Sequence, residues 1–145
     1  MPIFWIFAII WTAAIANSFW EAYVEGRNPW DKRKLGWKIK LHGGYVFPAY
    51  HFFLFVVMWP LLLILPLVVH GWDLKLFGII LSAYLTGTVI EDFGWFVVNP
   101  KVSLSEFNPK FATYYPWIKI GKFAIPLGYV VSLVVAFLSW YLIWR

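Results

Sequence analysis

The sequence predicts an all-α integral membrane protein, a bundle of four transmembrane helices with the N-terminus and the C-terminus on the outer side. Three observations support this prediction: the composition, four long apolar stretches and an uneven distribution of basic residues. The 145 residues are 62% hydrophobic and only 13% charged, with a mean hydropathy of +0.72. A soluble domain typically has about 25% charged residues. The length fits one bundle, so residues 1–145 are expected to form a single transmembrane domain.

The first two spans are expected at about residues 2–23 and 45–69. Each has roughly the 20 apolar residues that cross a hydrocarbon core as a helix. No basic residue precedes the first apolar stretch, so we expect a retained span instead of a signal peptide. Pro60 and Pro66 lie within the second span and should kink it, with neighbouring groups satisfying the freed carbonyls.

The third and fourth spans are expected at about residues 74–99 and 122–144. The third follows a tight turn at residues 70–73 and stops at Asn99-Pro100. Small side chains at four-residue spacing predict close helix packing for the first and third spans. These are Ala8, Thr12 and Ala16 in the first span, and Gly78, Ser82 and Thr86 in the third, with Ala83 and Gly87 beside them.

Ten of the twelve Lys and Arg residues fall in or beside two loops, at residues 24–44 and 100–121. Basic residues collect in cytoplasmic loops, so both loops are predicted to be cytoplasmic and both termini outside. This distribution accounts for the net charge of +5 without nucleic acid as a partner. A multi-pass protein of a prokaryotic plasma membrane is the expected location.

The basic segment at residues 27–40 alternates Lys and Arg with apolar side chains. We expect it to lie on anionic lipid headgroups as an amphipathic helix or a short strand. The alternative is a solvated segment that only sets the topology. Close-packing residues and abundant aromatics are also compatible with a homo-oligomer or with partner membrane subunits.

Two carboxylates inside the third span are the strongest functional signal. Glu91 and Asp92 lie about two turns before the end of that span, where a charged side chain costs roughly 2.5–3.5 kcal/mol and faces the bundle interior. Antiparallel spans would bring Glu21 and His51 to the same end of the bundle. Asn17, Glu25 and His42 are possible neighbours of this cluster.

Carboxylates combined with imidazole suit iron, manganese or zinc, and helical bundles build such sites from inward-facing side chains. We therefore predict a divalent metal held by Glu21, His51, Glu91 and Asp92, with Glu91 and Asp92 as candidate catalytic groups. A hydrogen-bonded or proton-sharing cluster is the alternative. The chain has no cysteine, which excludes iron–sulfur clusters and disulfides. Haem is disfavoured because no two histidines are expected to face each other at one depth.

The stretch EDFGWFVVNP at residues 91–100 resembles a pattern found in small, uncharacterised polytopic membrane proteins. It covers ten residues. The resemblance implies a membrane protein in which this end of the third span is important, and it implies no activity.

Three functions are compatible with these observations. The leading hypothesis is a metal-binding membrane protein, which could be an enzyme acting on a lipid or lipid-soluble substrate. The second is an accessory or structural subunit of a larger membrane complex. The third is a proton-coupled small transporter or channel, because two adjacent acids in low dielectric do not both ionise readily.

Overall fold

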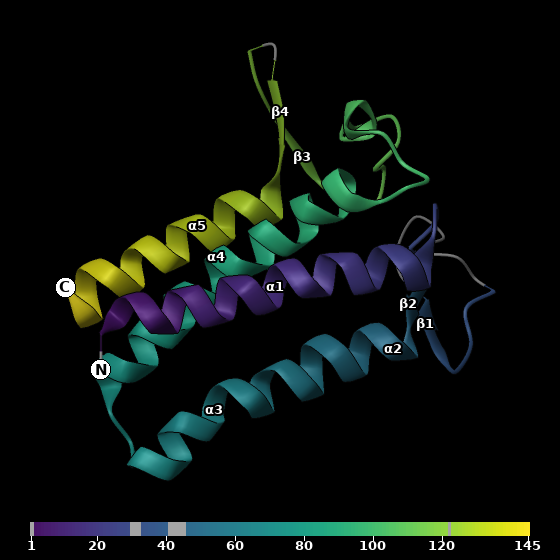
Figure 1. Cartoon of the computed structure of the whole chain (residues 1–145). Coiled ribbons are helices and arrows are strands. Elements are labelled where there is room, and N and C mark those ends of the chain that lie inside the picture. Colours follow the sequence, from purple (N-terminus) through teal and green to yellow (C-terminus); the bar gives the residue numbers. More distant parts are fainter. Residues whose placement is uncertain (1, 30–32, 41–45, 122) are drawn as a thin grey trace. The chain divides into compact units, whose positions relative to one another are not determined.

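The computed structural model describes residues 2–29, 33–40, 46–121 and 123–145 (Figure 1). These residues are mostly helical and include four helices that are long and apolar enough to cross a membrane. They comprise Ile3–Glu25, Ala49–His70, Leu74–Val98 and Leu127–Trp144. The chain forms two compact units, each of which is described by itself. The first contains Met1–Arg27 and Leu74–Arg145, and the second contains Asn28–Asp73.

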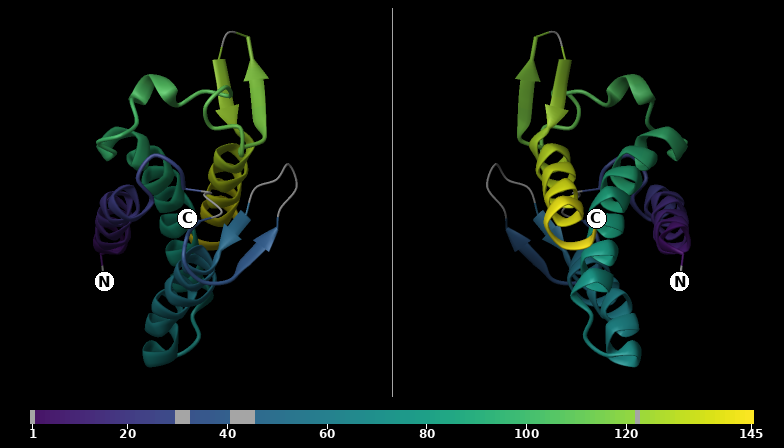
Figure 2. Two further views of the ribbon diagram at one scale, coloured as in Figure 1. Left: turned by 90° about the vertical axis from the view of Figure 1, so that its right-hand side faces the viewer. Right: turned by 90° about the vertical axis from the view of Figure 1, so that its left-hand side faces the viewer.

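The helices of the first unit are α1 (Ile3–Glu25), α4 (Leu74–Val98) and α5 (Leu127–Ser139), which a π-helical turn, η4 (Trp140–Trp144), extends. Figure 2 shows α4 between α1 and α5. The helices α1 and α4 run parallel. Hydrogen bonds join Trp11 to Thr86 near their middle and Gly26 to Asn99 at their ends, so residue numbers increase together along both helices. The other face of α4 packs antiparallel against α5.

Small residues of α4 line both helix contacts, as predicted from their spacing. The hydroxyl of Ser139 donates to the Gly78 carbonyl oxygen at 2.9 Å, on the α5 side. On the α1 side, a Cβ on Gly87 would lie 3.6 Å from the Ala14 methyl group. The ladder predicted for α1 was wrong, because Thr12 and Ala16 are exposed. The buried small residues of α1 are instead Ala14, Ser18 and Ala22, which are offset by two positions.

Between α4 and α5 the chain forms a folded loop and a β-hairpin, which an all-α expectation did not include. A 3₁₀ turn, η3 (Leu104–Glu106), is followed by β3 (Trp117–Ile120), which pairs antiparallel with β4 (Phe123–Pro126). The hairpin explains why the last helix begins at Leu127, five residues after the expected start at 122. Buried Ala112 and Phe96 belong to an aromatic-rich core that joins this loop to α4.

The second unit contains β1 (Lys38–Lys40) paired antiparallel with β2 (Val46–Pro48), then one long helical segment. That segment consists of α2 (Ala49–His51), a π-helical stretch η2 (Phe52–Met58) and α3 (Trp59–His70). The wider helical turn reflects the missing N–H of Pro60: the preceding Trp59 N–H bonds five residues back, to the Leu54 carbonyl oxygen. The strand at 38–40 matches one of the two forms expected for the basic segment.

Candidate functional site

Glu91 is fixed by two polar side chains of α1, which lie about two turns before that helix ends. The Asn17 side-chain amide donates to Glu91 Oε1 at 3.1 Å, and the Ser18 hydroxyl donates to the Glu91 backbone carbonyl oxygen at 2.7 Å. Ser18 can reach that backbone because α4 has a glycine, Gly94, at the point of closest approach. The missing side chain of Gly94 and the hydrogen bonds to Glu91 therefore belong to the same contact between α1 and α4.

The carboxyl groups of Glu21 and Glu91 meet across this interface. Both residues are 5% exposed, and their side chains lie within hydrogen-bonding contact. Two carboxylates in contact repel each other strongly where the dielectric constant is low. The arrangement is therefore stable when a proton or a metal cation lies between them. Glu25, one turn further along α1, is also buried.

Asp92 has a different environment from its neighbour in the sequence. The Tyr115 hydroxyl donates to Asp92 Oδ1 at 2.6 Å, and the Tyr129 hydroxyl donates to Oδ2. Burial, together with the charge of Asp92, raises the pKa of Tyr115 well above its ordinary value. The Tyr115 hydroxyl therefore stays protonated and acts as a hydrogen-bond donor. Each Asp92 oxygen thus accepts a hydrogen bond from a different segment, the loop and α5.

The two acids in α4 therefore face different neighbours, as expected for adjacent helical residues that project about 100° apart. Glu91 faces α1, whereas Asp92 faces α5 and the loop. The structure brings Glu21 and Glu91 into contact and places Asp92 beside them in a separate hydrogen-bond network. Tyr115 and Tyr129, which sequence reasoning did not single out, complete that network.

His51 belongs to the second unit, so its predicted place among the metal ligands stays a prediction. It is buried at the end of α2, where its ring stacks on Phe47 and Tyr50. His42, another possible neighbour, lies outside the described residues.

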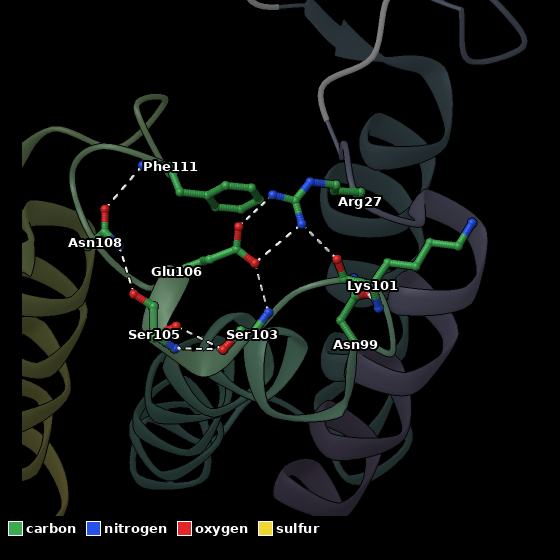
Figure 3. Close-up of polar contacts among 8 residues, drawn as sticks. All are labelled: Arg27, Asn99, Lys101, Ser103, Ser105, Glu106, Asn108 and Phe111. Atoms are coloured by element: carbon green, nitrogen blue, oxygen red, sulfur yellow. Dashed lines mark hydrogen bonds and ion pairs between the residues drawn. The ribbon is translucent and has the colours of Figure 1, made fainter.

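An ion pair at the end of α1 holds the loop that carries Tyr115 (Figure 3). The Arg27 guanidinium donates to the Glu106 carboxylate through both terminal nitrogens, Nη1 and Nη2. Its Nη1 also donates to the Lys101 carbonyl oxygen at 2.8 Å, and the group lies over the Phe111 ring. The Arg27 hydrogen bonds and the Ser103 N–H lower the pKa of Glu106 below its ordinary value. Glu106 and Ser103 also form a capping box, and the S-x-x-E spacing was the sequence signal for it.

Next to this ion pair, a hydrogen bond links the end of α1 directly to the end of α4. The Asn99 side-chain amide donates to the Gly26 carbonyl oxygen at 2.7 Å, and its oxygen accepts from the Lys101 N–H at 2.9 Å. The Asn-Pro sequence that ends α4 thereby also fixes the end of α1. These hydrogen bonds thus hold the ends of α1 and α4 together, on the side toward which Glu21 and Glu91 lie.

Comparisons with known protein families, with curated proteins and with solved structures found no match to this chain.

Proposed function

We propose that the chain is an integral membrane protein that binds a divalent metal ion through Glu21 and Glu91. The observation that carries this proposal is the contact of two buried carboxyl groups from different helices. Carboxylate oxygens are good ligands for manganese and iron, and zinc also accepts them. The Asn17 hydrogen bond supports the orientation of Glu91, as outer-shell partners do for metal-bound carboxylates.

The membrane location is supported by the surface of the helices as well as by their length. Large apolar side chains are exposed along the described helices, among them Phe4, Ile9, Leu61, Val97 and Leu142. Soluble monomers rarely expose apolar surface this extensively. The bias of ten basic residues to two supports cytoplasmic loops after α1 and α4, with both termini outside. In that orientation the carboxyl pair lies toward the cytoplasmic face.

The predicted roles of the remaining residues belong to the same proposal. His51 would supply a nitrogen ligand. Asp92, with Glu91, would serve as an acid–base group for a lipid or lipid-soluble substrate. Its two tyrosine donors would stabilise the charged form of Asp92 and set the orientation of the carboxylate. The four helices would together make the predicted bundle.

A binding titration with Mn²⁺, followed by the loss of the free-ion electron paramagnetic resonance signal, tests the proposal in detergent. Glu21→Gln and Glu91→Gln should each weaken Mn²⁺ binding at least about tenfold, which is 1.4 kcal/mol. Gln keeps the size of the side chain and removes the charge. The matched control is Glu106→Gln, which removes a carboxylate of the same unit outside the pair and should leave the affinity unchanged. Equal affinities for all four proteins would refute the metal site.

The same carboxyl contact also favours a second function, a proton carrier. If a shared proton replaces the metal, the protein would bind no Mn²⁺, and reconstituted vesicles would show proton flux that Glu91→Gln abolishes. The absence of both metal binding and proton flux would favour an accessory subunit.

A further inference from the structure

The β3–β4 hairpin separates its side chains into two chemically different faces. In an antiparallel pair, residues directly opposite each other point to the same side, and the sides alternate along each strand. The register pairs Ile118 with Ile125 and Ile120 with Phe123, so these four side chains share one face. We call it the apolar hairpin face. The opposite face carries Trp117, Lys119, Ala124 and Pro126.

Among the described residues, the second of these faces is covered more fully by the protein, whereas on the apolar hairpin face only Ile118 is half-buried. Pro126 is buried, and the Trp117 indole donates to the Ala112 carbonyl oxygen at 2.8 Å. On the apolar hairpin face, Ile120 is 57%, Phe123 76% and Ile125 36% exposed. A two-stranded hairpin is at best marginally stable alone in water. Three exposed, large apolar side chains on one face therefore favour an apolar environment.

The position of the hairpin identifies that environment. β4 passes into α5 without an intervening residue, and the Leu127 N–H closes the base of the hairpin on the Pro116 carbonyl oxygen at 2.7 Å. The hairpin projects sideways from the start of α5 instead of continuing along the helix axis (Figure 1). The helix α5 also exposes apolar side chains, among them Leu127, Val131 and Val134. If α5 crosses the membrane, the hairpin lies along the bilayer surface.

We propose that the β3–β4 hairpin inserts its apolar face among the acyl chains of the cytoplasmic leaflet and binds anionic lipid headgroups through Lys119. Lys119 is exposed on the opposite face, which would then lie at headgroup level. Lysines near an anionic leaflet are attracted to it, and their apolar stems can follow the lipid surface. This inference rests on the proposed membrane location.

The absence of cysteine makes the test direct, because one introduced cysteine takes one nitroxide spin label. Ile120→Cys reports on the apolar hairpin face, Leu133→Cys on the exposed side of α5, and Lys110→Cys on the exposed loop. Each labelled protein is reconstituted into phosphatidylcholine vesicles that contain phosphatidylglycerol. Collision with oxygen, which concentrates among acyl chains, is compared with collision with a water-soluble nickel chelate.

The label at position 120 should collide with oxygen frequently and with nickel rarely, as at position 133, whereas the label at 110 should collide mainly with nickel. Nickel access at 120 equal to that at 110 would overturn the proposal and place this face in water. Low collision with both reagents at 120 would also overturn it, because the face would then be covered by protein, such as a second copy. Nickel access at 133 would instead refute the membrane location itself.

The headgroup contact is tested separately with a fluorescent label on the Ile120→Cys variant. Brominated phosphatidylglycerol should quench it more than brominated phosphatidylcholine does. Lys119→Gln should reduce this preference about fivefold, as expected for one lysine at an anionic surface. An unchanged preference would overturn the assignment of Lys119.

Discussion

The Asp92 carboxylate is held by one tyrosine from the loop and one from α5, so three segments depend on a single residue. Tyr115 and Tyr129 donate to its two oxygens. Hydrogen bonds to charged groups are stronger than those between neutral groups. Asp92 thereby fixes the loop against the helices in addition to any role it has in chemistry.

Tyr115→Phe removes one of these hydrogen bonds and keeps the ring. We expect the free energy of unfolding to fall by about 1–2 kcal/mol, because Asp92 loses a donor while remaining partly buried. Thermal unfolding in detergent measures this as a lower Tm. Tyr141→Phe is the control, since Tyr141 lies exposed on η4 and its contact with Arg145 uses the ring. Equal Tm values for the two variants would show that the Asp92 bond is not stabilising.

The sequence predicted that Glu21 and Glu91 lie close together, and it did not predict the residues that surround Asp92. Glu91 was selected because a carboxylate deep in an apolar span is costly without a partner. Glu21 was selected because antiparallel spans would bring it to the same end of the bundle. Tyr115 and Tyr129 were not, because a tyrosine in an aromatic-rich chain carries no comparable signal. Their pairing with Asp92 depends on the path of the loop, which residue spacing does not determine.

Close contact between α1 and α4 depends on Gly94. A Cβ at this position would lie 2.5 Å from Ser18 Oγ and 3.2 Å from Ser18 Cβ. The hydroxyl could rotate away only by losing its hydrogen bond to the Glu91 carbonyl oxygen. The packing that brings Glu21 to Glu91 therefore requires glycine here.

Gly94→Ala should lower the free energy of unfolding by about 1–3 kcal/mol through overpacking. Gly128→Ala is the matched control, because a Cβ there meets no atom within 4 Å and alanine favours a helix. Thermal unfolding of both variants measures the difference. Ser18→Gly should partly restore stability in the Gly94→Ala background, as coupled neighbours do in a double-mutant cycle. If both glycine variants behave alike, the close contact is not limiting.

The loop after α4 is stabilised by the pH-sensitive ion pair between Arg27 and Glu106. The pKa of Glu106 is lowered in the folded protein, mainly by Arg27, so its ion pair stabilises the loop above the ordinary pKa of 4.5. That stabilisation is lost as the pH falls through the lowered pKa. At neutral pH, amide hydrogen exchange at residues 101–112 should be faster in Glu106→Gln than in the original protein. This difference should shrink on acidification; a difference that is constant with pH would contradict the role of the charge.

Helices were predictable from the sequence, and hairpins were not. Long apolar stretches bounded by Gly, Asn-Pro and Asp identify helices because the signal extends over many residues. Strands β3 and β4 have four residues each, and the apolar run from Phe123 continues without a break into α5. Composition alone therefore extended the predicted last span over β4.

The whole molecule separates into a unit of three helices with a loop and hairpin, and a unit that contains one long helical segment. Hydropathy predicted all four helices but could not show which of them pack together. Glu21, Glu91 and Asp92 fall in the first unit and His51 in the second. The predicted proximity of Glu21, Glu91 and Asp92 is therefore found within the first unit, and the histidine ligand stays a prediction.

The most direct test of the metal site is elemental analysis of the protein purified in mild detergent without added metal or chelator. Alongside it, Glu91→Gln is analysed, with Glu106→Gln as the control for loss of a carboxylate. The proposal predicts near-stoichiometric iron, manganese or zinc in the original protein and in the Glu106 variant, and its loss from the Glu91 variant. Metal bound equally by all three proteins, or by none of them, would contradict a metal site at Glu21 and Glu91.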